Sequence, residues 1–249
     1  MPVMDEFSQE REAVKNFSLK KKLEYFWYYY KWYVIGGAFA FILIFSFIYD
    51  LVTAKDYAFY GVFLNSLGRE EISDTFLDDF IELASLDTEE YNVVIDDSLY
   101  ITPGAGDEAS TSAQQKVILL MAAGDLDVLS ADAESFEHYA TTDNFLDLRT
   151  ILSQEQLEKY EPYFYYVDMA QLRQLEEAAN SGNMRFELPD VDHHDPSSME
   201  EPVPIALYIN NSKKVTDAYA FSGREVPMGV AVTTKRVDTV LQFIDYIFE

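Results

Sequence analysis

An uninterrupted apolar stretch runs from Tyr33 to Tyr49 and contains no charged residue. Flanking apolar residues extend it to positions 32–52, with Asp50 as the one charge inside these bounds. A helix rises about 1.5 Å per residue, so about 20 residues cross a hydrocarbon core about 30 Å thick. The sequence therefore predicts one transmembrane helix over residues 32–52.

Basic residues lie mainly before this stretch and predict its orientation. The lysines that closely precede it are Lys20, Lys21, Lys22 and Lys31. Shortly after it, only Lys55 is basic. Because lysine and arginine are retained on the cytoplasmic side, the N-terminus is predicted to lie in the cytoplasm. Residues 25–33 are rich in tyrosine and tryptophan, which favour the membrane boundary. We therefore expect residues 1–31 to form a cytoplasmic tail with an aromatic interface to the lipid bilayer.

Two other interpretations of the apolar stretch compete with an anchor. A cleaved signal peptide has a shorter apolar region and small residues at its cleavage site, whereas bulky Phe47, Ile48 and Tyr49 occupy that zone here. A buried core helix would leave the lysine asymmetry and the aromatic cluster unexplained. The sequence contains no cysteine, which excludes disulfides, thiolate ligands and a lipid-modified cysteine. We adopt the uncleaved, single-pass anchor of a bacterial cell membrane.

Negative charge is concentrated after the apolar stretch. The chain has 18 basic and 44 acidic residues, a net charge of −26. Residues 50–249 hold 12 of the basic and 39 of the acidic residues. This charge repels nucleic acid and anionic lipid and tolerates cations. A solvated surface surrounded by counter-ions accounts for it without any partner, and a cationic partner is the alternative. We expect no nucleic-acid partner.

Residues 57–249 alternate between short apolar runs and amphipathic stretches, a pattern typical of an α/β domain. The predicted strands are 57–64, 91–95, 128–129, 163–167, 204–210 and 227–234. The predicted helices are 69–86, 114–123, 134–140, 153–160, 168–179 and 235–249. The first strand–helix–strand unit favours parallel pairing. We therefore predict a three-layer α/β fold with a mostly parallel sheet, lying outside the cell.

Three passages of this domain resemble extracellular solute-binding proteins, which have the type 2 periplasmic-binding-protein-like fold. The first is YGVFLN with the helix and strand that follow, the second is QQKVILLMAAGDLDVLSAD, and the third is VAVTTKRVDTVLQFIDYIF. The domain is shorter than a full two-lobed binding protein, so the resemblance implies a second lobe reduced to the material between about residues 130 and 204. It also implies solute capture, with no cofactor.

Polar side chains follow three of the predicted strands where each strand ends. In parallel α/β sheets, ligands bind beyond the carboxyl ends of the strands. The candidate ligand-binding residues are Asn65, Ser66, Ser98, Ser130 and Asp132. Because Arg69 is the one basic residue in these loops, a neutral or cationic ligand fits better than an anion. Turn formation and helix capping explain the same residue types without any ligand.

The loop after residue 189 holds the densest cluster of metal-ligand side chains. Its members are Asp190, Asp192, His193, His194 and Asp195. Imidazoles and carboxylates suit zinc and similar metals. Adjacent histidines on a loop rarely face one centre, however, and the spacing of HExxH or of an EF-hand is missing. Adventitious binding, or none, is the competing interpretation of this weak metal site.

Sequence signatures of catalysis are missing, so we expect no enzymatic activity. There is no GxSxG, and the glycines of the loop 102–112 lack the spacing of a phosphate-binding loop. The main functional hypothesis is a membrane-anchored binding or accessory module that acts beside a transporter. The alternative is a scaffolding protein of the bacterial envelope that binds another protein without a small ligand. A hydrolase that uses one of the many carboxylates is a third hypothesis.

Overall fold

The computed structural model describes residues 18–102, 104, 106–182, 189 and 191–249. The chain divides into two compact units, Met1–Ala54 and Lys55–Glu249. We describe each unit by itself. Residues 1–17 of the predicted cytoplasmic tail lie outside the described residues.

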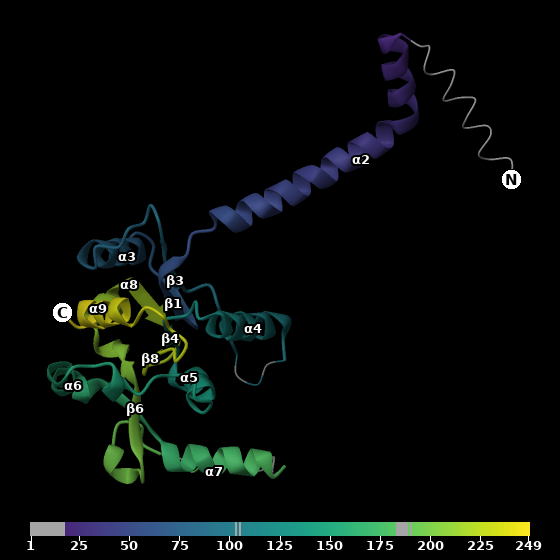
Figure 1. Cartoon of the computed structure of the whole chain (residues 1–249). Helices are drawn as coiled ribbons and strands as arrows, with labels where there is room; N and C mark the ends of the chain where they lie inside the picture. The colour runs from purple at the N-terminus through teal and green to yellow at the C-terminus, as the bar shows by residue number, and fades with distance from the viewer. Residues whose placement is uncertain (1–17, 103, 105, 183–188, 190) are drawn as a thin grey trace. The chain divides into compact units, whose positions relative to one another are not determined.

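The first unit contains one long helix, α2 (Leu19–Thr53), shown in Figure 1. Its segment Tyr30–Tyr49 has a mean hydropathy of 2.0 and is long and apolar enough to cross a membrane. None of this segment is buried against other described residues, which distinguishes it from a core helix. The helix begins about three and a half turns before the predicted span. The aromatic residues that precede the span are therefore part of the same helix.

The second unit is an α/β domain built on a mixed six-stranded sheet. In spatial order its strands are β3 (Asn92–Asp96), β1 (Tyr57–Phe63), β4 (Val128–Ser130), β8 (Pro227–Val230), β6 (Pro202–Tyr208) and β5 (Phe164–Asp168). Strand β1 pairs in parallel with β3 and β4, whereas the pairings β4–β8, β8–β6 and β6–β5 are antiparallel. The prediction of a mostly parallel sheet is therefore wrong for three of its five strand pairings.

The error has a physical cause. A strand that is buried on both faces has the same continuous apolar sequence in a parallel and in an antiparallel sheet, so its sequence does not indicate the direction of pairing. Strand β8 comes from the end of the chain and lies between β4 and β6, opposite in direction to both. It follows that β6 runs in the same direction as β1, β3 and β4. The carboxyl ends of these four strands consequently lie at one edge of the sheet.

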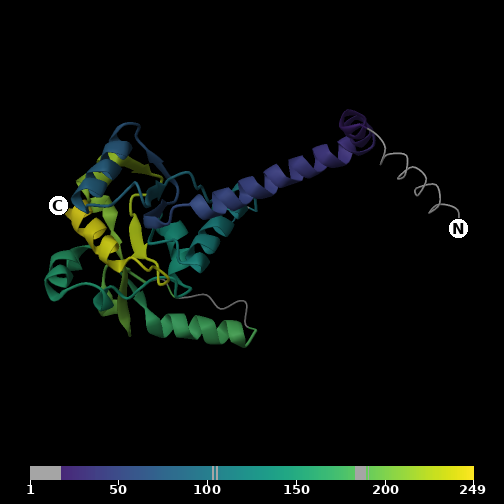
Figure 2. The same ribbon diagram turned by 45° about the horizontal axis from the view of Figure 1, so that its top comes forward.

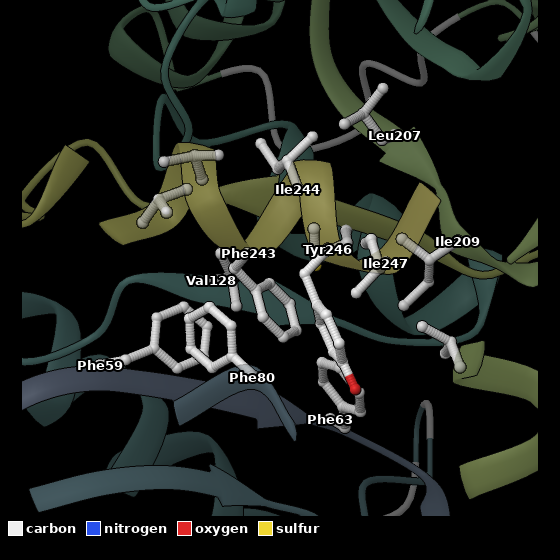
Figure 3. Close-up of a cluster of buried hydrophobic side chains, with 14 of the residues drawn as sticks. Phe59, Phe63, Phe80, Val128, Leu207, Ile209, Phe243, Ile244, Tyr246 and Ile247 are labelled. Carbon is white, nitrogen blue, oxygen red and sulfur yellow. The ribbon is translucent and has the colours of Figure 1, made fainter. Parts of the chain in front are cut away.

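Helices cover both faces of the sheet, as Figures 1 and 2 show. One face carries α3 (Ile72–Leu83), α6 (Gln154–Tyr160), α8 (Lys213–Ala218) and α9 (Val237–Phe248), and the other carries α4 (Glu108–Ala123), α5 (Ala133–Ala140) and α7 (Met169–Asn180). Each face has its own cluster of buried apolar side chains. Figure 3 shows part of the first cluster, where Phe59 and Phe80 lie against Phe243 with ring centroids 4.6 and 5.0 Å from that of Phe243.

Local sequence signals explain most helix ends. The predicted capping box forms between Ser153 and Gln156 at the start of α6. Gly124 ends α4 with a φ of 72°, a left-handed conformation that favours glycine. Helix α4 begins at Glu108, six residues before the predicted start at residue 114. Asp107 caps this earlier start by accepting a hydrogen bond from the backbone N–H of Ser110 at 2.8 Å. A small second sheet of β2 (Ser66–Gly68) and β7 (Tyr219–Phe221) is not among the strands predicted from the sequence.

Candidate functional site

A surface groove of about 690 Å³ lies at the edge where β1 and β4 end. Four segments form it: Asn65 after β1, residues 100–102 after β3, residues 132–134 after β4, and residues 222–225 between β7 and β8. The topology brings these segments together because the carboxyl ends of β1, β3 and β4 share one edge. This is the edge at which α/β sheets generally bind ligands.

Asn65 fixes the floor of the groove. Its φ of 54° is in the left-handed region, which asparagine tolerates better than most residues. The side-chain amide donates to the carbonyl of Ile101 at 2.9 Å, to Oδ2 of Asp132 at 2.8 Å and to Oγ of Ser135 at 3.0 Å. Its oxygen accepts from the backbone N–H of Ile101 at 2.7 Å. One buried side chain thus joins the ends of β1 and β4 to the loop after β3.

Asp132 and the loop 222–225 form one wall. Oδ1 of Asp132 accepts from the backbone N–H of Ser135 at 3.0 Å and caps α5. A Cβ atom at Gly223 would lie 2.7 Å from Cβ of Asp132, so the loop can approach this closely only with glycine there. The backbone N–H and hydroxyl of Ser222 both donate to the carbonyl of Asn65, at 3.1 and 3.0 Å. The loop is therefore bonded to the floor.

The other three candidate ligand residues do not line this groove. Oγ of Ser66 donates to the carbonyl of Phe63 at 2.8 Å, and Oγ of Ser98 donates to Oδ1 of Asp96 at 2.6 Å. Ser130 is fully buried, and its hydroxyl has no hydrogen-bond partner within the described part of the chain. Of the five candidates, the structure brings together Asn65 and Asp132.

Asp96, at the end of β3, forms an ion pair with Lys116 near this edge. Burial raises the pKa of its carboxyl, but the ammonium of Lys116 at 2.6 Å and the hydroxyl and backbone N–H of Ser98 outweigh burial and hold the pKa below its ordinary value. A carboxylate with a depressed pKa stabilises the fold fully above its unfolded pKa, about 3.9. That contribution is lost as the pH falls through the folded pKa.

We expect Asp96→Asn to lower the free energy of unfolding by about 1–2 kcal/mol at pH 7, because a charge-assisted hydrogen bond is lost. The difference from the wild type should shrink as the pH falls from the unfolded pKa, about 3.9, through the lower folded pKa, because the wild-type carboxyl becomes protonated over this interval. Thermal unfolding at pH 7 and pH 3 measures this, with the exposed Asp78→Asn as the matched control. An equal deficit at both pH values would contradict this role of the charge.

The two histidines of the proposed metal loop are both stacked on tyrosines. The ring of His193 lies 4.2 Å from that of Tyr165, and the ring of His194 lies 4.1 Å from that of Tyr208, each nearly parallel. Nδ1 of His193 contacts the carbonyl of Tyr166 at 2.7 Å. Nε2 of His194 lies 3.3 Å from a carboxylate oxygen of Glu225. The stacking fixes this loop on strands β5 and β6.

The carboxylates of the same loop are used as turn caps. Asp192 accepts from the backbone N–H of His194 at 2.9 Å, and Asp195 accepts from that of Ser197 at 2.9 Å. Asp190 lies outside the described residues. Among the residues that the structure describes, no three histidine or acidic side chains are grouped as a metal site would require.

Several residues that line the groove are not among the candidate ligand residues predicted from the sequence. Arg224 and Glu225 line the groove from the loop between β7 and β8, and Tyr100 lines it from the loop after β3. The hydroxyl of Tyr100 donates to the carbonyl of Ser66 at 2.5 Å, which fixes this side chain at the rim. The dipeptide Ser222-Gly223 is a turn signal that could have marked the first of these loops.

No protein-family model, no curated protein and no solved structure matches this chain.

Proposed function

We propose that this chain is a single-pass membrane protein of a bacterial envelope whose C-terminal domain lies outside the cell and binds a small neutral or cationic ligand without catalysis. In this proposal it acts as an accessory module beside a transporter or another envelope protein. The observation that carries the proposal is the preformed groove at the carboxyl-end edge of the sheet, floored by Asn65 and walled by Asp132.

The charge of the groove supports this choice of ligand. Three acidic residues line it, Asp132, Glu134 and Glu225, against one basic residue, Arg224. The surrounding domain is also strongly acidic. An anionic ligand would meet repulsion from both, whereas a cation gains from both. The backbone and hydroxyl groups of residues 100–102 and 222 add neutral hydrogen-bonding groups at the rim.

The direction of the strands supports a relationship in architecture to solute-binding proteins. Strands β3, β1, β4 and β6 run in one direction and place their carboxyl ends at the edge that holds the groove. A reduced second lobe would leave such a groove open on one side. We therefore expect weak, rapidly reversible binding rather than capture in a closed cleft.

The proposed orientation follows from the charges that flank the apolar helix. Lys20 and Lys21 lie in the first turn of α2, and Lys31 is the second residue of the segment Tyr30–Tyr49. We expect protease added to intact cells to degrade residues 57–249 and to leave an N-terminal tag protected. A mature protein that begins after Val52, or a domain that resists protease until the cells are lysed, would contradict the anchored, outward-facing topology.

Ligand binding is tested on the full-length protein in nanodiscs, by calorimetric titration with amino acids, polyamines, sugars and short peptides. A ligand present at 100 times its Kd stabilises the fold by about 2.7 kcal/mol, so thermal shifts provide a second readout. Glu134→Lys should abolish binding of a cationic ligand, because Glu134 is exposed in the groove. Glu155→Lys on α6 makes the same charge change outside the groove. Equal binding by both variants would overturn this site.

A further inference from the structure

A second groove, of about 480 Å³, lies between α3, α8 and α9. Ile72 and Leu83 mark the two ends of α3 and are both 48% exposed, although they are large apolar side chains. They are separated by three turns, so they share one face of the helix. Between them on this face lie Phe76, which is only 4% exposed, and the exposed carboxylate of Asp79. The two exposed apolar side chains are thus about 16 Å apart along α3.

The walls of this groove are held in place without a partner. The hydroxyl of Tyr246 on α9 donates to the carbonyl of Phe76 on α3 at 2.8 Å. Nη1 of Arg69 donates to the carbonyls of Thr216 and Asp217 at 2.8 Å each, which ties the chain before α3 to the end of α8. A groove that is already formed binds a partner at a lower entropic cost than one that must be ordered.

Acidic side chains lie between and beside these apolar side chains. Asp79, Glu82 and Asp217 line the groove and are exposed. Among the described residues that line it, Lys214 is the one cation, and its ammonium lies 4.3 Å from the ring centroid of Tyr246 and donates to the carbonyl of that residue at 2.9 Å. Three carboxylates therefore face one ammonium among these lining residues, and the rim has a net negative charge.

The apolar side chains and the acidic rim of the groove together indicate which kind of partner it can bind. A second copy of the same domain would bring its own excess of acidic residues against an acidic rim, which disfavours self-association. A small polar ligand would leave Ile72 and Leu83, about 16 Å apart, exposed to water. An amphipathic helix that carries both leucine-type and lysine or arginine side chains matches this length, the two apolar positions and the acidic charge of the groove.

We propose that the groove between α3, α8 and α9 is a docking site for a basic amphipathic helix, about three turns long, of another envelope protein. Its apolar side chains cover Ile72 and Leu83, and its basic side chains face Asp79, Glu82 and Asp217. This surface lies apart from the ligand groove at Asn65, so either proposal can fail without the other.

The test uses full-length protein in nanodiscs of neutral lipid and a labelled helical peptide of about 14 residues. The peptide carries leucines at i, i+3, i+4 and i+7 and lysines elsewhere. A matched peptide carries glutamate in place of each lysine. We expect saturable binding of the lysine peptide by fluorescence anisotropy, weakened by salt, and no binding of the glutamate peptide.

Exposed positions allow variants that preserve the fold. Leu83→Lys and the double variant Asp79→Lys/Glu82→Lys should each weaken binding of the lysine peptide by about tenfold or more. The first replaces an apolar contact with a charge, and the second reverses the charge of the rim. The matched controls are Leu119→Lys on α4, which is 68% exposed, and Glu176→Lys/Glu177→Lys on α7. Both controls should bind as the wild type does.

Three outcomes would overturn the proposal. The first is equal binding of the lysine and glutamate peptides, and the second is equal loss of binding in the groove and control variants. The third is self-association of the wild type in sedimentation that Leu83→Lys abolishes, since this would make a second copy the occupant. Unchanged melting temperatures of the variants confirm that lost binding does not reflect lost folding.

Discussion

Replacing Phe243 by alanine is expected to lower the free energy of unfolding by about 3–5 kcal/mol. The side chain is fully buried, and its ring centroid lies 4.6 Å from that of Phe59 on β1 and 5.0 Å from that of Phe80 on α3. The change removes a whole aromatic ring from the junction of three elements, and the surrounding rings cannot close the cavity. Domains are typically stable by about 5–15 kcal/mol, so this loss is a large share of the total.

Urea unfolding of the full chain in a mild detergent measures this effect. The α/β domain contains 12 of the 18 tyrosines and neither of the two tryptophans, so the tyrosine dichroism in the near ultraviolet that is lost in urea reports mainly on this domain. Gln242→Ala, at the exposed neighbouring position of the same helix, is the matched control and should change stability by less than about 0.5 kcal/mol. A similar small loss for Phe243→Ala would show that α9 does not complete the core.

The helices of the domain could be predicted because their signals are local. The apolar residues of α3 and α9 repeat at helical spacing, and Ser153 with Gln156 forms the expected capping box. The order and direction of the strands could not be predicted in the same way. They depend on β8, which pairs with β4 across a separation of about 100 residues. The sequence of a short apolar strand does not indicate which other strands it pairs with.

The residues of the candidate ligand site could be predicted only in part. Asn65 and Asp132 meet because each follows a parallel strand, and that relation could be seen in the pattern. The serines beside them have short side chains that bond within their own turns, as Ser98 does with Asp96. The loop at Ser222 bonds to Asn65 from 157 positions away, which no local signal indicates.

Replacing Arg236 by methionine is expected to cost about 3–5 kcal/mol of stability at pH 8, because it leaves a buried charge without its partner. Asp127 is fully buried before β4, in the GDLD passage that suggested a resemblance to solute-binding proteins. Nε of Arg236, at the start of α9, lies 3.1 and 2.9 Å from its two carboxylate oxygens. The backbone N–H of Tyr60 donates to the same carboxylate at 2.8 Å.

The pH dependence of this variant provides the sharper test. Burial raises the pKa of Asp127 above its ordinary value, and the guanidinium of Arg236 opposes this shift. Without the guanidinium the folded pKa rises further, so the folded state binds a proton more readily than the unfolded state does. Stability then falls as the pH rises through that pKa. The deficit of Arg236→Met should therefore be smaller at pH 5 than at pH 8.

A second substitution separates the buried charge from the lost packing of the arginine stem. Asp127→Asn in the Arg236→Met background removes the charge but keeps an oxygen that can accept from the N–H of Tyr60. Because removing both partners of a buried pair costs much less than removing one, the double variant should recover most of the loss at pH 8 and show little pH dependence. A double variant no more stable than Arg236→Met, with a deficit that is constant from pH 5 to pH 8, would show that Arg236 stabilises the junction of β4 and α9 by packing alone.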